Sequence, residues 1–147
     1  MKITLCGSIL FYEQMQDIAE RLIALGHEVK LPPAEISGPD GQMMKVQDYY
    51  RLRKETMTTE GWIWDQKELA IRRHFDKIDW ADVILVTNFD KKGIAGYIGG
   101  NTLIEMGVTF YNHKRIYLLK SVPEIDSKEE ILGMKPVVIS DDLSLIV

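Results

Sequence analysis

Apolar residues along the chain fall into short continuous runs separated by longer stretches with helical spacing. The short runs are rich in β-branched residues and predict buried strands at residues 3–6, 28–31, 83–86, 115–119 and 136–139. Between the first two runs, residues 10–25 follow helical spacing, and Gly26 predicts a left-handed cap at the end of that helix. The first thirty residues therefore form a βαβ unit, whose two strands the right-handed crossover rule makes parallel.

Each remaining connection also contains a helical or turn-like pattern. These patterns lie at residues 49–56, at 65–79, directly after Thr102, within 123–132 and at 141–146. Strands that alternate with helices in this way predict a single α/β domain over residues 1–147. We expect a three-layer, Rossmann-like or flavodoxin-like fold with a five-stranded parallel sheet.

Residues 33–64 depart from this alternation. They contain several glycines and prolines, weak periodicity and a concentration of Met, Tyr and Trp side chains. Long irregular segments in compact domains are usually functional, so the pattern predicts a lid-like excursion. The alternative is a surface segment whose aromatic side chains only cover the core. Its short helix at 49–56 is expected to expose Arg51, Arg53 and Lys54.

Composition narrows the class of protein. The 147 residues are 46% hydrophobic with a net charge of −4, which suits one core and argues against a general nucleic-acid binder. No apolar run reaches membrane-spanning length, and the N-terminus does not resemble a signal peptide. The single Cys6 excludes an internal disulfide and fits a reducing compartment, and the three histidines are far apart and not paired with cysteine. We expect a cytoplasmic protein with no metal site and no membrane association.

The most informative stretch follows the central strand at 83–86. A glycine-rich loop leads from it into the helix that contains Glu105, and open α/β sheets bind ligands at this carboxyl edge. Two readings of Glu105 compete, both of which place it in the first turn of the helix. Thr102 and Glu105 have the spacing of a capping box, in which the glutamate bonds the N-cap amide. Alternatively, the carboxylate is stabilised as an anion near the helix N-terminus and serves as a nucleophile.

The first strand ends in Gly7-Ser8, at the position of a phosphate-binding loop. The sequence there matches neither the dinucleotide fingerprint nor a Walker motif. It is either a plain turn or a site where Ser8 caps a helix and backbone N–H groups face an anion. Cys6 is not followed by an arginine that could hold a transferring phosphate, which favours a buried strand residue over a nucleophile.

Taken in order, Gly7-Ser8, residues 78–86 (IDWADVILV) and residues 99–107 (GGNTLIEMG) resemble the nucleoside 2-deoxyribosyltransferase family. That family includes base-exchanging transferases and N-hydrolases of nucleoside 5′-monophosphates. The resemblance covers most of the chain except residues 33–64. It implies that Glu105, followed by Met106 and Gly107, attacks the anomeric carbon and forms a glycosyl-enzyme. Such a retaining displacement needs a carboxylate on one face of the sugar and a proton donor on the other.

The chain departs from the family pattern at several positions. Members usually carry an aspartate eight residues before the one that matches Asp82, and here that residue is His74. His74 is either a proton donor to the leaving base or a partly buried histidine beside the helix. Gly99 stands where the family tends to have Ser or Asp, and Asn101 and Thr102 replace small residues.

The sequence therefore predicts an enzyme that cleaves or transfers the N-glycosidic bond of a nucleoside or nucleotide. The predicted catalytic residues are Glu105, His74, Asp76 and Asp90, and the predicted substrate-binding residues are Gly7, Ser8, Ile9, Trp62, Trp64, Asn88, Gly99, Gly100, Asn101 and Thr102. No metal or organic cofactor is required, and the partners are a small nucleoside or nucleotide and a second copy of the chain, as a homodimer or larger homo-oligomer. The competing hypothesis is a non-catalytic nucleotide-binding sensor with the same fold.

Overall fold

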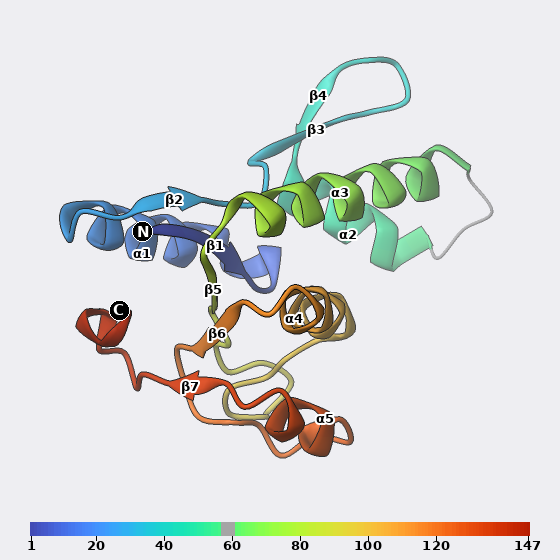
Figure 1. Ribbon diagram of the computed structural model, residues 1–147. Coiled ribbons are helices and arrows are strands. Elements are labelled where there is room, and N and C mark those ends of the chain that lie inside the picture. The colour runs from blue at the N-terminus through green and yellow to red at the C-terminus, as the bar shows by residue number, and fades with distance from the viewer. Residues whose placement is uncertain (57–60) are drawn as a thin grey trace.

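The computed structural model describes residues 1–56 and 61–147 and shows an α/β arrangement around a five-stranded sheet (Figure 1). The sheet contains β1 (Lys2–Cys6), β2 (Glu28–Lys30), β5 (Val83–Val86), β6 (Arg115–Leu118) and β7 (Val137–Val138). All neighbouring pairs are parallel, in the order β2-β1-β5-β6-β7. The predicted fold class is confirmed, and each predicted strand lies within one residue of its observed bounds at either end.

The helices follow the predicted pattern with some changes at their ends. They are η1 (Ile9–Phe11), α1 (Tyr12–Ala24), α2 (Val46–Thr56), α3 (Gly61–Trp80), α4 (Gly100–Tyr111), α5 (Lys128–Gly133) and η2 (Leu143–Leu145). Gly26 has a φ of +90° after the end of α1, as predicted for a left-handed cap. The largest difference is α3, which begins four residues earlier than the pattern at 65–79 indicates.

Residues 33–64 are more regular than their weak periodicity predicts. They form the antiparallel pair β3 (Glu35–Ser37) and β4 (Met43–Lys45), then α2 and the start of α3. Ile36, Tyr49 and Ile63 bury together, and the Tyr49 hydroxyl donates to the Ile63 carbonyl at 2.6 Å. These contacts stabilise strands of only three residues each. Such strands are too short to show an alternation of apolar and polar residues, so the sequence pattern predicts an irregular segment instead.

The two faces of the sheet pack against different helices, because successive strand residues point to opposite sides. Ile3, Leu5, Val83 and Leu85 pack with α1 and the C-terminal turn. The alternate residues of the same two strands point to the other face, toward the layer formed by α3, α4 and α5. They include Cys6, Ile84 and Val86. Figure 1 shows these two layers on either side of the sheet. Cys6 is consequently directed toward α3 and α4 at the carboxyl end of β1.

Candidate active site

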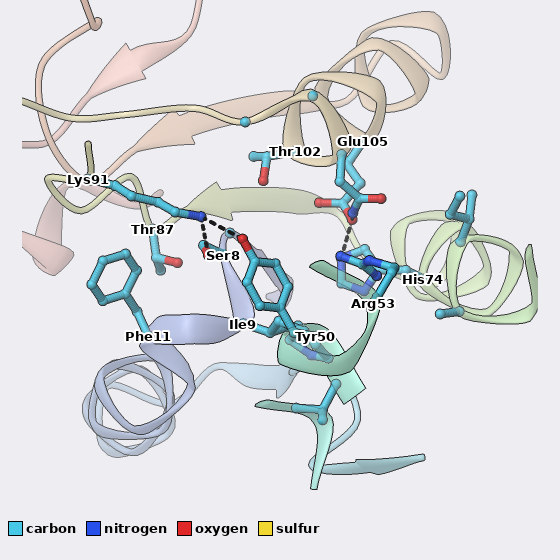
Figure 2. Close-up of a pocket in the computed structure, with 18 of the residues that line it drawn as sticks. Ser8, Ile9, Phe11, Tyr50, Arg53, His74, Thr87, Lys91, Thr102 and Glu105 are labelled. Carbon is cyan, nitrogen blue, oxygen red and sulfur yellow. Dashed lines mark hydrogen bonds and ion pairs between the residues drawn. The ribbon is translucent and has the colours of Figure 1, made fainter. Parts of the chain in front are cut away.

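A cavity of about 480 Å³ opens at the carboxyl ends of β1 and β5 (Figure 2). The turn after β1, the loop after β5 and the N-terminal part of α4 form one side of it. Side chains of α2 and α3 close the other side. Ligands of open parallel sheets bind at this edge, so the cavity is the candidate active site.

Glu105 lines this cavity and is only 5% exposed. Its Oε1 accepts a hydrogen bond of 2.7 Å from the side-chain amide of Asn101, one helical turn earlier. Its Oε2 is buried and has no hydrogen-bond partner among the described residues. A buried carboxylate oxygen without a partner is costly, which is typical of a position kept for a ligand or for chemistry.

The predicted capping box is wrong. The helix α4 begins at Gly100 with Gly99 as its N-cap, so Glu105 lies in the second turn rather than in the first. The helix starts two residues before Thr102, and its N-cap residue Gly99 makes no side-chain capping hydrogen bond. Glu105 is therefore directed into the cavity instead of back to the start of its helix.

Cys6 and His74 lie beside Glu105. The His74 Nε2 atom is 3.4 Å from the Cys6 Sγ and 3.7 Å from the Glu105 Oε1. All three residues are buried, and Figure 2 shows the His74 ring directed at the Glu105 carboxylate. The sequence places Cys6 in a buried strand, which is confirmed, but it gives no sign that a histidine 68 residues away contacts it.

Burial dominates the acid–base properties of this group. It raises the pKa of Glu105 to about 8, against smaller opposing effects of the Cys6 hydrogen bond, the Lys67 charge and the Asn101 hydrogen bond. Burial, and then the charge of Lys77, lowers the pKa of His74 to about 4. Burial, followed by the negative charge of Glu105 and a hydrogen bond with it, raises the pKa of Cys6. At pH 7 both His74 and Glu105 are mainly neutral, so their contact is not an ion pair.

Positive side chains outnumber negative ones among the charged residues of the cavity wall. The lining includes Arg53, Lys54, Lys67, Lys91 and Lys92, whereas Glu105 is the single acidic residue among its described members. Lys91 Nζ donates to the Ser8 hydroxyl and to the Tyr50 hydroxyl, both at 3.2 Å. Figure 2 shows this group across the cavity from Glu105. A cationic cavity in a chain of net charge −4 indicates an anionic ligand.

Most of the predicted site residues line the cavity. They are Gly7, Ser8, Ile9, Trp64, His74, Asn88, Gly99, Gly100, Asn101, Thr102 and Glu105. The Asn88 amide nitrogen donates to the Gly96 and Ser121 carbonyls, and its oxygen accepts from the Lys120 amide. Asn88 therefore holds two loops together in addition to lining the cavity.

Three predicted site residues lie outside the lining. Asp76 is exposed on α3, and Asp90 is exposed in the loop after β5, where it accepts a hydrogen bond from the Gly96 amide. Trp62 is half-buried and packs against Tyr49 with ring centroids 6.3 Å apart. Helical periodicity directs Asp76 away from the sheet, and Trp62 is drawn into the small core under β3. We therefore assign no catalytic role to Asp76 or Asp90 and no substrate-binding role to Trp62 in the site.

Sequence reasoning missed Tyr50, Arg53, Lys67 and Lys91. Arg53 is half-buried and lines the cavity, which corrects the expectation that it is exposed. It also lies over the Tyr50 ring, with its guanidinium carbon 5.2 Å from the ring centroid. Lys91 could have been found, because it follows the central strand in a loop that starts the glycine-rich segment. No local pattern in the sequence indicates that α2 lies over the cavity.

Gly7 sits where two backbones come together, and this gives a stability prediction. An added Cβ would lie 2.3 Å from the Thr87 Oγ1 and 3.1 Å from the Thr87 carbonyl oxygen, so Gly7→Ala should destabilise the protein by about 1–3 kcal/mol. Gly107→Ala is the matched control, because its Cβ meets nothing within 4 Å and alanine stabilises a helix by up to about 1 kcal/mol. Urea unfolding of both variants measures the difference. Equal midpoints would contradict the close approach of Gly7 and Thr87.

No protein-family model matches the sequence, and no match to a curated protein sequence was found. Among solved structures, the fold is similar to a CMP N-glycosidase, BcmB, from Clostridium botulinum. The match has a TM-score of 0.50 and 17% identity over 94% of this chain and 85% of that chain. A 2-deoxyribosyltransferase from Bacillus psychrosaccharolyticus also matches, with a TM-score of 0.45 and 19% identity over 80% of this chain and 71% of that chain. At these identities the likeness to BcmB shows a shared fold.

A helix that crosses a bilayer needs about 20 consecutive, mainly apolar residues. In residues 1–56 and 61–147, none is both long enough and apolar enough to span a membrane.

Proposed function

We propose that this protein cleaves or transfers the N-glycosidic bond of a nucleoside 5′-monophosphate, with Glu105 as the nucleophile. The observation that carries the proposal is the buried Glu105 carboxylate. It lines a cavity whose charged side chains are mostly positive, and its Oε2 atom has no hydrogen-bond partner among the described residues. The family resemblance of the sequence supports the same chemistry. So does the shared fold with BcmB, whose name assigns it N-glycosidase activity on CMP.

The reaction follows from the position of Glu105. A carboxylate oxygen attacks the anomeric carbon, the C–N bond breaks, and the base leaves with the bonding electron pair and takes a proton from water. Water or a second base then attacks the same carbon, loses a proton to the hydroxide left by the first step, and releases Glu105 as a carboxylate. Asn101 holds Oε1 through its side-chain amide, which leaves Oε2 as the attacking atom. Because both displacements invert the anomeric carbon, the overall reaction retains its configuration.

The distribution of charge favours a monophosphate over a free nucleoside. No ion pair to a carboxylate is found for Arg53, Lys67 or Lys91 within the described residues. The two observed hydrogen-bond partners of the Lys91 ammonium are neutral hydroxyl groups, so its positive charge is not neutralised by them and can attract an anion. A phosphate bound there would be held by charge-assisted hydrogen bonds, which are about twice as strong as neutral ones. Its sugar would then extend toward Glu105 (Figure 2).

His74 has a different role from the one its residue type suggests. With a pKa lowered to about 4, its ring is neutral at pH 7 and cannot act as an imidazolium donor to the leaving base. In the proposed reaction it instead packs beside Oε1 and helps to exclude water from the nucleophile. The predicted homodimer remains a prediction, and so does the cytoplasmic location.

A panel of nucleosides and nucleoside 5′-monophosphates tests the proposed function. Each compound is incubated with the purified protein, and free base is separated and quantified with and without a second base as acceptor. We expect base release from at least one 5′-monophosphate, at a rate well above that of its nucleoside. Tight binding of nucleotides with no base release from any of them would instead support the sensor hypothesis.

The pKa of Glu105 leads to a pH prediction. Only the ionised carboxylate attacks, and its fraction rises as the pH approaches a pKa of about 8. The value of kcat/KM should therefore increase by about 25-fold between pH 6.5 and pH 8.5, as expected for one ionisation near 8. Initial rates in buffers of constant ionic strength measure this profile. A profile that is flat or falls over this range would contradict attack by ionised Glu105.

A further inference from the structure

Cys6, His74 and Glu105 bring three different ligand types together at one point. They come from the end of β1, the middle of α3 and the second turn of α4, and one ligand atom of each lies within 4.8 Å of the others. All three residues are buried. The spacing of the histidines in the sequence predicts no metal site, but folding places His74 beside the single cysteine.

Neighbouring contacts fix this group in place. The hydroxyl of Thr4, two residues before Cys6 on the same face of β1, donates to the Lys77 carbonyl at 2.8 Å and so anchors α3 against the strand. Lys77 lies one helical turn after His74. On the other side, the Asn101 amide holds Oε1 of Glu105. These contacts hold α3 against β1 and hold the Glu105 carboxylate beside His74.

We propose that Cys6, His74 and Glu105 bind a Zn²⁺ ion through Sγ, Nε2 and the carboxylate, with a fourth position open to the cavity. Tetrahedral zinc with bonds of about 2.3 Å to sulfur and about 2.1 Å to nitrogen and oxygen separates sulfur from nitrogen by about 3.6 Å and nitrogen from oxygen by about 3.4 Å. The corresponding distances in the structure are 3.4 Å and 3.7 Å. These two distances fit a zinc ion to within a few tenths of an ångström. The Cys6 Sγ and the Glu105 carboxylate lie within 4.8 Å of each other and would approach to about 3.6 Å when the ion binds.

The chemistry of the ligands selects the metal. A thiolate and an imidazole favour Zn²⁺ and similar borderline-soft ions, whereas Ca²⁺ and Mg²⁺ need six or more oxygen ligands. The oxygen that faces His74 is Glu105 Oε1, at 3.7 Å from Nε2, and it can bind the ion while it still accepts the hydrogen bond from Asn101. Binding converts the Cys6 thiol to a thiolate, and the displaced proton leaves to solvent. His74 and Glu105 line the cavity, which is the entry path for the ion.

The metal site goes beyond the proposed function and does not rest on it. Three protein ligands and one open position are typical of zinc sites that remain accessible to small molecules. An ion at this position uses the Glu105 carboxylate that the glycosyl transfer needs as a nucleophile. Zinc and the glycosyl-enzyme are therefore mutually exclusive, and zinc should inhibit base release.

The experiment titrates the full-length, chelator-stripped and reduced protein with Co²⁺ alone, then displaces it with Zn²⁺. We expect one Co²⁺ per chain with visible bands of tetrahedral cobalt and a thiolate-to-cobalt charge-transfer band, followed by loss of these bands as one equivalent of Zn²⁺ is added. Cys6 is the single cysteine, so a charge-transfer band can come only from it. Saturating Co²⁺ without any thiolate band, or a failure of Zn²⁺ to bind, would overturn the proposal.

Three variants assign the ligands. His74→Asn should weaken Zn²⁺ binding at least about 100-fold, since loss of a ligand costs more than the 10–100-fold seen for outer-shell changes. Its matched control is His113→Asn, at an exposed residue with a φ of +57° that asparagine tolerates, and it should bind as the parent does. Cys6→Ser should lose the charge-transfer band, and Glu105→Gln should bind at least about 100-fold more weakly. Parent-like affinity in folded His74→Asn protein would contradict the site.

Activity separates this proposal from the proposed function. Stoichiometric Zn²⁺ should stop base release by the metal-free protein, and a chelator should restore it. A protein that binds Zn²⁺ at these residues but releases no base from any nucleotide would refute the proposed function alone. An active protein that gives no Co²⁺–thiolate band would refute the metal site alone.

Discussion

Glu105→Gln should lower the rate of base release by at least about 10³-fold, because a neutral amide cannot attack the anomeric carbon. Glutamine has the same length, and its oxygen can still accept the hydrogen bond from Asn101. Nucleotide binding should largely persist, since the cationic residues of the cavity are unchanged. Single-turnover release of base and equilibrium binding of the nucleotide, measured on the same protein, give the two quantities.

Stability provides a check that Glu105→Gln is folded. The pKa of Glu105 is raised by burial, so this residue contributes more stability below about pH 4.5 and loses that contribution as the pH rises through about 8. The variant removes this loss and should melt no earlier than the parent at pH 8. Glu20→Gln, at an exposed position of α1, is the matched control and should keep parent activity. A folded Glu105→Gln protein that releases base at the parent rate would exclude Glu105 as the nucleophile.

Lys91→Met should reduce kcat/KM for a nucleoside 5′-monophosphate by about 10- to 150-fold, because a hydrogen bond to a charged group contributes about 1.5–3 kcal/mol. Methionine keeps most of the length of the side chain but removes the ammonium that contacts Ser8 and Tyr50. The corresponding nucleoside lacks the phosphate, so its kcat/KM should change by less than about threefold. Steady-state kinetics with the matched pair of substrates measure both values.

The control for this prediction is Lys45→Met, which removes an exposed lysine of β4 that does not line the cavity. It should leave both substrates unaffected apart from general electrostatic effects that added salt removes. An equal loss for nucleoside and monophosphate in Lys91→Met would mean that Lys91 holds the cavity together and does not bind phosphate.

The sheet could be predicted from sequence because its strands are buried on both faces. Continuous runs such as the one at Val83–Val86 have no other common explanation at that length, and the right-handed crossover rule sets their direction. Glu105 could be singled out for a similar reason, since the carboxyl edge of a parallel sheet is where ligands bind. Both inferences depend on local pattern combined with general rules of topology.

The partners of Glu105 could not be predicted, because they depend on contacts between distant segments. Cys6 and His74 are 68 residues apart, and no spacing rule connects a strand end with the middle of a helix. The capping box was a reasonable local pattern, but the glycines before Thr102 allow α4 to start earlier. Similarly, Arg53 lines the cavity through the packing of α2 on α3, where the Tyr49 hydroxyl donates to the Ile63 carbonyl.

The neutral state of Glu105 connects the two proposals. A carboxyl group with a pKa of about 8 is mostly protonated at pH 7, so both attack on a sugar and ligation of zinc require loss of the same proton. Lys67 partly offsets the effect of burial on Glu105, and its own pKa is lowered to about 8 by burial and then by the charge of Arg53. A phosphate in the cavity would offset the repulsion among these cations, which supports an anionic substrate.

Peptide mass spectrometry of the enzyme during turnover tests the central claim most directly. A nucleotide with fluorine at the 2′ position slows breakdown of the glycosyl-enzyme, because it destabilises the oxocarbenium-like transition state. After an acid quench and proteolysis, the peptide that contains Glu105 should carry the added mass of one sugar phosphate, and fragmentation should place it on Glu105. Release of free base while this peptide keeps its unmodified mass, or an added mass on another residue, would contradict the account.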